Sequence, residues 1–204
     1  MPPTVEDIWR SDRLIYRSIR EDDQEWWFKN IDGDPNNICL STPLILAPPR
    51  KAKTEDFMKL WTTPDSLLDC IVCLRQPKNT GKGDDTEAPE TRIGFVRLAH
   101  GGYGTSPHSR AGNFGIVLAA PYQNKGYGTE ATNWILDWAF RHGNMHSVNL
   151  GTIDYNKRAH RCYEKCGFKL GGRRRQCFWH DRKYWDLLFY DILEEEWKEL
   201  RGYQ

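Results

Sequence analysis

A strand-to-helix transition near the middle of the chain constrains the fold most. Residues 114–120 are mostly apolar, as in a buried strand, and Pro121 ends this run. Residues 123–128, Gln-Asn-Lys-Gly-Tyr-Gly, follow and lead into a segment with helical periodicity. Its apolar residues recur at the spacing of one helix face: Ala131, Trp134, Ile135, Trp138 and Ala139. The glycines therefore lie in a turn between a strand and a helix.

Such a turn can bind phosphate. The first N–H groups of a helix lack intrahelical partners, and the helix dipole places partial positive charge there. Gly126 and Gly128 let the backbone approach an anion closely, and Lys125 adds a cation. Glycines at a helix start can also be plain turn residues. The chain contains neither G-x-G-x-x-G nor G-x-x-x-x-G-K-(S/T), so a dinucleotide or Walker-type site has little support.

Two segments carry a family resemblance. Residues 123–128 resemble the (Gln/Arg)-x-x-Gly-x-(Gly/Ala) signature of the GNAT superfamily of acyl-CoA N-acyltransferases. Residues 156–168 resemble its next signature, an Asn followed by a helix that ends in Tyr-Glu-Lys-x-Gly-Phe. The ends of the chain are similar to the RimJ/RimL-like branch, at residues 13–23 and 172–197. The resemblance spans roughly residues 10–198.

The resemblance implies an α/β fold, a three-layer sandwich. Its central mixed, mostly antiparallel sheet would be splayed at the acyl-CoA site, with helices on both faces. Residues 1–204 are expected to form a single domain, because a chain of this size with 39% hydrophobic residues can bury a core without disulfides. The polar loop 76–91 is expected to be an elaboration of that fold.

The residue patterns predict the elements coarsely. A Pro-containing irregular segment is expected up to Arg50, and a polar tail from Glu194. The predicted strands are 14–17, 67–74, 92–99, 114–120, 147–153, 169–179 and 183–190, and the predicted helices are 22–31, 54–62, the segment after the glycine turn, and 157–166.

The resemblance also implies which residues bind acetyl-CoA. The backbone near Ile116, Val117 and Leu118, left unpaired by the splay, would bind pantetheine and polarise the thioester carbonyl. Asn156 would contact coenzyme A or a bridging water, although an Asn before a helix is also an ordinary N-cap. The turn expected to hold the pyrophosphate consists of Gln123, Asn124, Lys125, Gly126, Tyr127, Gly128 and Thr129.

The implied reaction is attack of an amine on acetyl-CoA, with the CoA thiolate leaving. Tyr163 matches the family tyrosine that protonates the thiolate, and without the resemblance it would be interpreted as a core aromatic residue. Many relatives carry a Glu base two residues before a Gly on the preceding strand, where this chain has Asn113. Three alternatives remain: a base elsewhere, proton loss through ordered water, or an acceptor amine that needs little help. The candidate bases are His100, His108 and Glu87.

The acceptor is expected to be a primary amine of a small molecule, such as a polyamine or amino acid, or a protein N-terminus. A Lys-like amine with a pKa of about 10.4 is neutral in about one molecule in a few thousand at pH 7, whereas an α-amine near about 8 is roughly a tenth neutral. Residues 26–28, Trp-Trp-Phe, could form an acceptor wall or belong to the core. Residues 21–23, Glu-Asp-Asp, could attract a polyamine or simply begin a helix. O-acetylation, a longer acyl chain, or an acyl-CoA sensor with little turnover are the alternatives.

Charge and cysteine content exclude other classes. A net charge of +1 gives no broad field for nucleic acid or an anionic membrane. No signal peptide or membrane-spanning run is recognisable, so a cytoplasmic protein is expected, with the nucleus possible, as a monomer or homodimer. The C-x-x-C at 70–73 is strand-like and lacks a matching second pair, and Cys162 and Cys166 share a helix face, so no metal is expected.

Overall fold

The sheet of this protein contains seven strands in the order β1-β2-β3-β4-β5-β7-β6. The computed structural model describes residues 8–41, 46–59, 65–75, 90–102 and 106–203. Glu87 and nearly all of the predicted loop 76–91 lie outside these ranges. The strands are β1 (Leu14–Arg17), β2 (Ser66–Leu74), β3 (Thr91–His100), β4 (Ala111–Leu118), β5 (Ser147–Ile153), β6 (Lys169–His180) and β7 (Lys183–Leu193).

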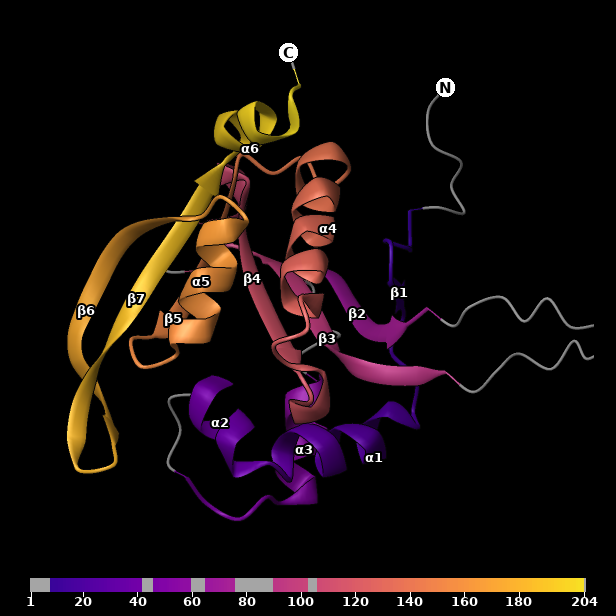
Figure 1. Ribbon diagram of the computed structural model, residues 1–204, viewed down its shortest axis with the longest axis vertical. Helices are drawn as coiled ribbons and strands as arrows, with labels where there is room; N and C mark the ends of the chain where they lie inside the picture. Colours follow the sequence, from indigo (N-terminus) through magenta and orange to yellow (C-terminus); the bar gives the residue numbers. More distant parts are fainter. Residues whose placement is uncertain (1–7, 42–45, 60–64, 76–89, 103–105, 204) are drawn as a thin grey trace, which may run out of the picture.

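Helices cover both faces of the sheet. In Figure 1, α4 and α5 lie in front of the strands, and α1, α2 and α3 gather at the opposite end from α6. A π-helical turn, Phe28–Asp32, directly continues α1. The helices are α1 (Asp23–Trp27), α2 (Pro35–Ser41), α3 (Lys51–Lys59), α4 (Tyr127–Arg141), α5 (Lys157–Lys165) and α6 (Glu194–Arg201).

Alternate residues of β2 separate the core into two parts. Cys70 and Val72 pack with side chains from α4 and α5, whereas Ile71 and Cys73 pack on the other face with Trp27. This alternation is the period-two pattern of a strand buried on both faces. The three-layer α/β architecture predicted from the resemblance is confirmed.

All neighbouring strands are antiparallel except β4 and β5, which run parallel. That parallel pairing is short: it joins Ala111 to Ser147, Gly112 to Val148 and Asn113 to Asn149. Beyond Asn113, β4 continues to Leu118 while still paired to β3 on its other side. The two central strands therefore part after three residue pairs, which confirms the predicted splay.

Two helices were not predicted. The segment expected to be irregular contains α2, which begins at Pro35, a favoured first helical residue, and the side chain of Asp34 accepts a hydrogen bond from the N–H of Asn36 at 2.9 Å. The expected polar tail is α6. Its three leading glutamates suit the positive end of a helix dipole, and Trp197 packs into the core.

Several predicted boundaries were also wrong. The strand predicted over 114–120 begins at Ala111 and ends at Leu118, because residues 120–122 form a 3-10 turn. The short helix predicted over 54–62 begins at Lys51. Periodicity locates the apolar centre of an element, whereas hydrogen bonding fixes its ends.

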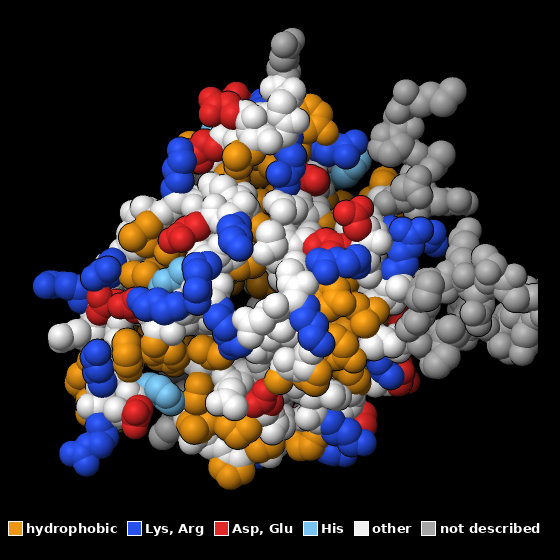
Figure 2. All heavy atoms as spheres, in the orientation of Figure 1, with side chains coloured by type: hydrophobic (Ala, Val, Ile, Leu, Met, Phe, Trp, Pro, Cys, Tyr) orange, Lys and Arg blue, Asp and Glu red, His pale blue; other side chains and the backbone are white. Residues whose placement is uncertain are grey.

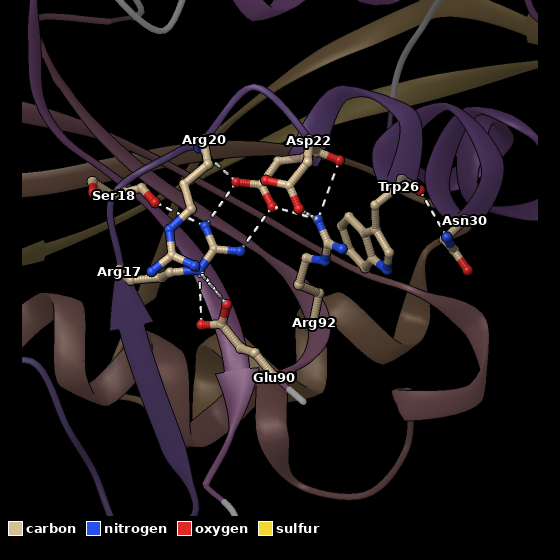
Figure 3. Close-up of polar contacts among 9 residues, drawn as sticks. Arg17, Ser18, Arg20, Asp22, Trp26, Asn30, Glu90 and Arg92 are labelled. Atoms are coloured by element: carbon tan, nitrogen blue, oxygen red, sulfur yellow. Dashed lines mark hydrogen bonds and ion pairs between the residues drawn. The ribbon is translucent and has the colours of Figure 1, made fainter. Parts of the chain in front are cut away.

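A buried ion-pair network fixes the start of α1 to the sheet. Asp23 is fully buried and accepts two hydrogen bonds from Arg17 of β1, at 2.7 and 2.8 Å, and one from Arg92 of β3, at 3.0 Å. Figure 3 shows Arg17 also contacting Glu90, and Arg92 reaching Asp22. Of residues 21–23, which the sequence offered as a possible attractant for a polyamine, Asp22 and Asp23 are thus paired with arginines.

Candidate active site

A cavity of about 990 Å³ occupies the place where β4 and β5 part. β4 lines one side and β5 with α5 lines the other, while α2 and the start of α4 close its ends. In Figure 2 a hollow lies at the centre of this face, with Lys and Arg side chains around it. Its volume is at the upper end of the range typical of small-molecule sites.

The glycine turn borders this cavity, and two of its residues have left-handed backbone conformations. Gly126 precedes α4 with a φ of 83°, in the left-handed region that favours glycine, and Asn124 has a φ of 59°. Of the residues predicted to bind coenzyme A, Lys125 and Tyr127 do not line the cavity. Those that do are Ile116, Val117, Leu118, Gln123, Asn124, Gly126, Gly128, Thr129 and Asn156.

The turn is supported from behind by residues that directly precede β1. Arg13 donates from Nε to Glu130 at 2.7 Å, and its guanidinium carbon lies 4.6 Å from the centre of the Tyr127 ring. Burial by itself raises the pKa of Glu130, but the hydrogen bonds from Arg13 and Ser11 outweigh it and keep the pKa lowered. Glu130 is thus a charged anchor for the first turn of α4.

Helix α2 bridges the two arms of the splay. On the β4 side, Gln123 donates from Nε2 to Asn37 at 2.6 Å and to the Leu118 carbonyl at 2.8 Å. On the β5 side, the hydroxyl of Tyr155 donates to the Cys39 carbonyl at 2.5 Å, and Asn156 donates to the Leu40 carbonyl at 3.1 Å. Helix α2 therefore links the two sides of the cavity, through the Asn37 side chain toward β4 and through two backbone carbonyls toward β5.

Asn37 brings an unused donor to this site. Its residue is 3% exposed and lines the cavity, yet its Nδ2 finds no acceptor among the described residues. A buried amide without a partner is unfavourable unless a ligand or water completes it. The sequence did not identify Asn37, because its contact with Gln123 joins residues 86 positions apart.

The cavity wall on α5 is basic. Arg158, Arg161 and Lys165 line it at three-and-four spacing, and Arg158 donates to Gln123 Oε1 at 2.9 Å. Cations on the same side as a helix N-terminus suit a ligand with several phosphates. Sequence analysis missed these residues, although their spacing after Asn156 was a readable signal.

Tyr163 and Asn156 each combine a structural position with a place in the cavity wall. Tyr163 is 8% exposed and packs edge-to-face on Phe114, with ring centres 6.3 Å apart. Asn156 caps α5 by accepting a hydrogen bond from Ala159 N–H at 3.3 Å. Both interpretations of these residues given by the sequence are therefore compatible with the structure.

Neither of the two proposed bases that the structure describes is brought to the site. His100 pairs with Gly112 at the joined end of β4, and His108 is exposed in a 3-10 turn, so neither lines the cavity. Glu87 lies outside the described residues. Asn113 donates from Nδ2 to Asn149 Oδ1 at 3.2 Å, across the last paired rung of β4 and β5. Its amide thus lies where the splay begins.

The three aromatic residues at positions 26–28 differ in their relation to the cavity. Trp27 is buried and lines the cavity, whereas Trp26 and Phe28 do not line it.

Cys70 and Cys73 lie in different core clusters on opposite faces of the sheet, so they cannot share a metal. Cys162 lines the cavity, and a hydrogen bond with Cys166 lowers the pKa of its thiol despite burial.

In the described part of the chain, no helix has both the length and the apolarity needed to cross a bilayer.

Comparisons with known proteins agree with this architecture. A spermidine N-acetyltransferase of Vibrio cholerae, solved with CoA and spermine, superimposes with a TM-score of 0.68 at 21% identity, covering 90% of this chain and 97% of that one. A GNAT-family acetyltransferase of Bacillus anthracis gives 0.69 at 22% identity, covering 91% and 98%. These likenesses show the fold.

Sequence relatives match over shorter stretches. The uncharacterized N-acetyltransferase YnaD of Bacillus subtilis is 36% identical over 83 residues, which cover 41% of this chain and 49% of YnaD. The spermidine N(1)-acetyltransferase of Vibrio cholerae is 30% identical over 111 residues, covering 54% and 62%. The matches thus span about half to three fifths of these relatives.

The family assignment rests on a longer match. The acetyltransferase (GNAT) domain family matches residues 13–169, from the strand that supports the glycine turn to the end of the segment that contains α5. This range includes the splayed strands, the glycine turn and Tyr163. The chain therefore belongs to the acetyltransferase (GNAT) domain family.

Proposed function

We propose that this protein is an acetyl-CoA-dependent N-acetyltransferase. It moves an acetyl group to a primary amine of a small molecule or a protein N-terminus by direct attack on the thioester. Residues 1–204 act as a single domain of the RimJ/RimL-like branch. The observation that carries the proposal is the cavity between β4 and β5, which ends at a glycine turn with a left-handed residue and at a basic helix face.

The cavity residues suit the parts of acetyl-CoA. Arg158, Arg161 and Lys165 supply charge for the phosphates, together with the start of α4. Asn37 offers its unused Nδ2 to a pantetheine carbonyl. The β4 backbone at residues 116–118 offers hydrogen bonds to pantetheine and stabilises the oxyanion that forms on the thioester carbonyl.

The chemistry then needs two proton movements. The neutral amine forms the new N–C bond, the C–S bond breaks, and the CoA sulfur takes a proton from the Tyr163 hydroxyl. The proton lost by the amine nitrogen leaves through water and restores Tyr163, so that acetyl-CoA and amine give amide and free CoA. Asn113 cannot serve as the base, which favours proton loss through water.

The test measures thiol release from acetyl-CoA against polyamines, amino acids and short peptides, beside a calorimetric acetyl-CoA titration. Turnover with an amine, and acetylation of its nitrogen seen by mass spectrometry, is the expected result. Binding of acetyl-CoA without turnover across the panel would contradict it and favour an acyl-CoA sensor, for which Asn113 is the motivating residue. Propionyl-CoA, butyryl-CoA and alcohol acceptors in the same assay test the longer-chain and O-acyl alternatives.

A further inference from the structure

Arg97 of β3 lies beside the point where β4 leaves β5. It is paired in register with Gly115 of β4, two residues beyond the last β4–β5 pair. Gly115 has no side chain, and a Cβ built there would meet nothing within 4 Å, so the surface over it is open to the Arg97 side chain. Arg97 and Gly115 both line the cavity, and Gly115 precedes Leu118, the last residue of β4 before the chain turns toward Gly126.

The charge of Arg97 is incompletely paired. Its side chain is 23% exposed, and its one ionic partner in the described residues is Asp69, with 3.7 Å between Nε and Oδ1. That separation exceeds a hydrogen bond, and Oδ1 of Asp69 is itself buried without a hydrogen-bond donor in the described part of the chain. Burial raises the pKa of Asp69, and Ser66 and Arg97 do not outweigh it. A largely buried guanidinium in this position favours an anionic partner.

The rest of the cavity does not offset this charge. Among its described lining residues, Asp32 is the one acidic side chain. Its two oxygens already accept hydrogen bonds, from Trp27 Nε1 at 3.0 Å and from the Thr54 hydroxyl. A polycationic acceptor would therefore meet the Arg97 guanidinium near the reacting carbonyl, with Asp32 as the one carboxylate among the described lining residues to attract it.

The position of Arg97 follows from the chemistry already proposed. If the pyrophosphate lies at Gly126 and pantetheine follows β4 from Leu118 toward Ile116, the thioester comes close to Gly115. An amine attacking there has Arg97 as its nearest cationic side chain on β3. This inference rests on the proposed function and narrows its acceptor.

We propose that the acceptor is a primary amine that also carries a carboxylate, and that the Arg97 guanidinium binds this carboxylate beside Gly115. Arg97 thereby sets specificity: it orients the amine toward the thioester and disfavours polyamines. The carboxylate belongs either to a free amino acid or to an acidic first residue of a peptide.

Matched acceptor pairs test this directly. Ornithine and putrescine, lysine and cadaverine, and tryptophan and tryptamine differ within each pair by one carboxylate. We expect the wild-type protein to favour the carboxylate-bearing member by about 10- to 100-fold in kcat/KM, the factor expected of a charge-assisted hydrogen-bonded pair. Peptides beginning with Asp or with Asn, tested in parallel, distinguish the two sources of the carboxylate.

Arg97→Met should reduce that preference to about unity, mainly through a higher KM for the carboxylate-bearing member. Arg97→Lys keeps the charge without the planar fork and should retain an intermediate preference. It also serves if Arg97→Met folds poorly. Arg158→Met is the matched control, because it removes a charge from the phosphate side of the cavity. It should weaken acetyl-CoA binding and leave the preference within pairs unchanged.

The outcomes separate this proposal from the function on which it rests. Equal or better turnover of the decarboxylated amines by the wild-type protein, or an unchanged preference in Arg97→Met, overturns the assignment of the acceptor alone. Absence of thiol release with every acceptor overturns the acetyltransferase function, and the acceptor class with it.

Discussion

The guanidinium of Arg13 donates a hydrogen bond to the carbonyl of Lys125, with 3.0 Å between Nη1 and the oxygen. The two residues are 112 positions apart, and the contact fixes the glycine turn to the residue that directly precedes β1. Arg13→Ala should raise the acetyl-CoA Kd about 3- to 10-fold, since one hydrogen bond contributes about 1 kcal/mol. Calorimetric titration measures this. Ser11→Ala removes another hydrogen bond to Glu130 without touching the turn and should leave Kd nearly unchanged.

Gly126→Asp should weaken acetyl-CoA binding by about tenfold or more, because it adds a negative charge to the turn proposed to hold the phosphates. Its Cβ would also lie 3.2 Å from Arg13 Nη2 and disturb the residue that supports the turn. Gly202 is a suitable control: its φ is 68°, its Cβ would meet nothing within 4 Å, and it ends α6 outside the cavity. Gly202→Asp therefore carries comparable backbone strain without the repulsion. Equal Kd values for the two variants would show that the phosphates bind elsewhere.

Tyr163→Phe should slow the acetyl-transfer step by about 10²- to 10⁴-fold in single-turnover experiments, while acetyl-CoA affinity stays near the wild-type value. Tyr190→Phe is the matched control. Tyr190 is also buried, with its ring centre 6.3 Å from that of Tyr163, but it does not line the cavity. A wild-type transfer rate in Tyr163→Phe would leave this tyrosine a core residue only.

Asp23 predicts a pH dependence of stability. Burial alone raises its pKa, but the hydrogen bonds from Arg17, the Arg20 N–H and Arg92 prevail and lower it below the ordinary 3.8. A carboxyl group with a lower pKa in the folded state stabilises the protein above its unfolded pKa. This contribution is lost as the pH falls through the folded value. Unfolding free energy should therefore decrease as the pH falls below about 4.

Asp23→Asn should lower the unfolding free energy at pH 7 by about 3 kcal/mol, because it removes the buried carboxylate that pairs with both Arg17 and Arg92. It should also reduce the loss of stability below about pH 4. Urea unfolding at a series of pH values measures both effects. Glu25→Gln is the control: its carboxylate pairs with Lys29 and Lys51 at the exposed surface, where water and salt weaken the attraction. If Asp23→Asn lost stability as steeply as the wild type when the pH falls below about 4, that loss would come from other carboxyl groups.

Local sequence patterns predicted what depends on local structure. The turn at Gly126 and the helix behind it follow from glycine chemistry and from apolar periodicity, and most strands follow from their apolar runs. The splay came from the family resemblance, since nothing within residues 114–118 shows that their neighbour strand leaves them. Helix α2 was missed because the prolines of the segment up to Arg50 suggested irregular structure, although Asp34-Pro35 is a favourable helix start.

The site residues that the sequence did not reveal depend on contacts between distant segments. Arg97 is an ordinary strand residue until the register places it over Gly115. Asn37 can be recognised as a cavity residue only from the tertiary contact between α2 and Gln123. Asp23 looked like part of a charged helix start, and tertiary packing buried it between Arg17 and Arg92. Local periodicity contains no information on such pairs.

The short pairing between β4 and β5 makes the stability of the protein depend on the concentration of its ligand. Three residue pairs join these strands, so a ligand between them contacts both halves of the sheet and opposes their separation. Its binding free energy adds to the free energy of unfolding: at a concentration of 100 times Kd, the gain is about 2.7 kcal/mol. Thermal denaturation and proteolytic half-life should then report how much acetyl-CoA surrounds the molecule.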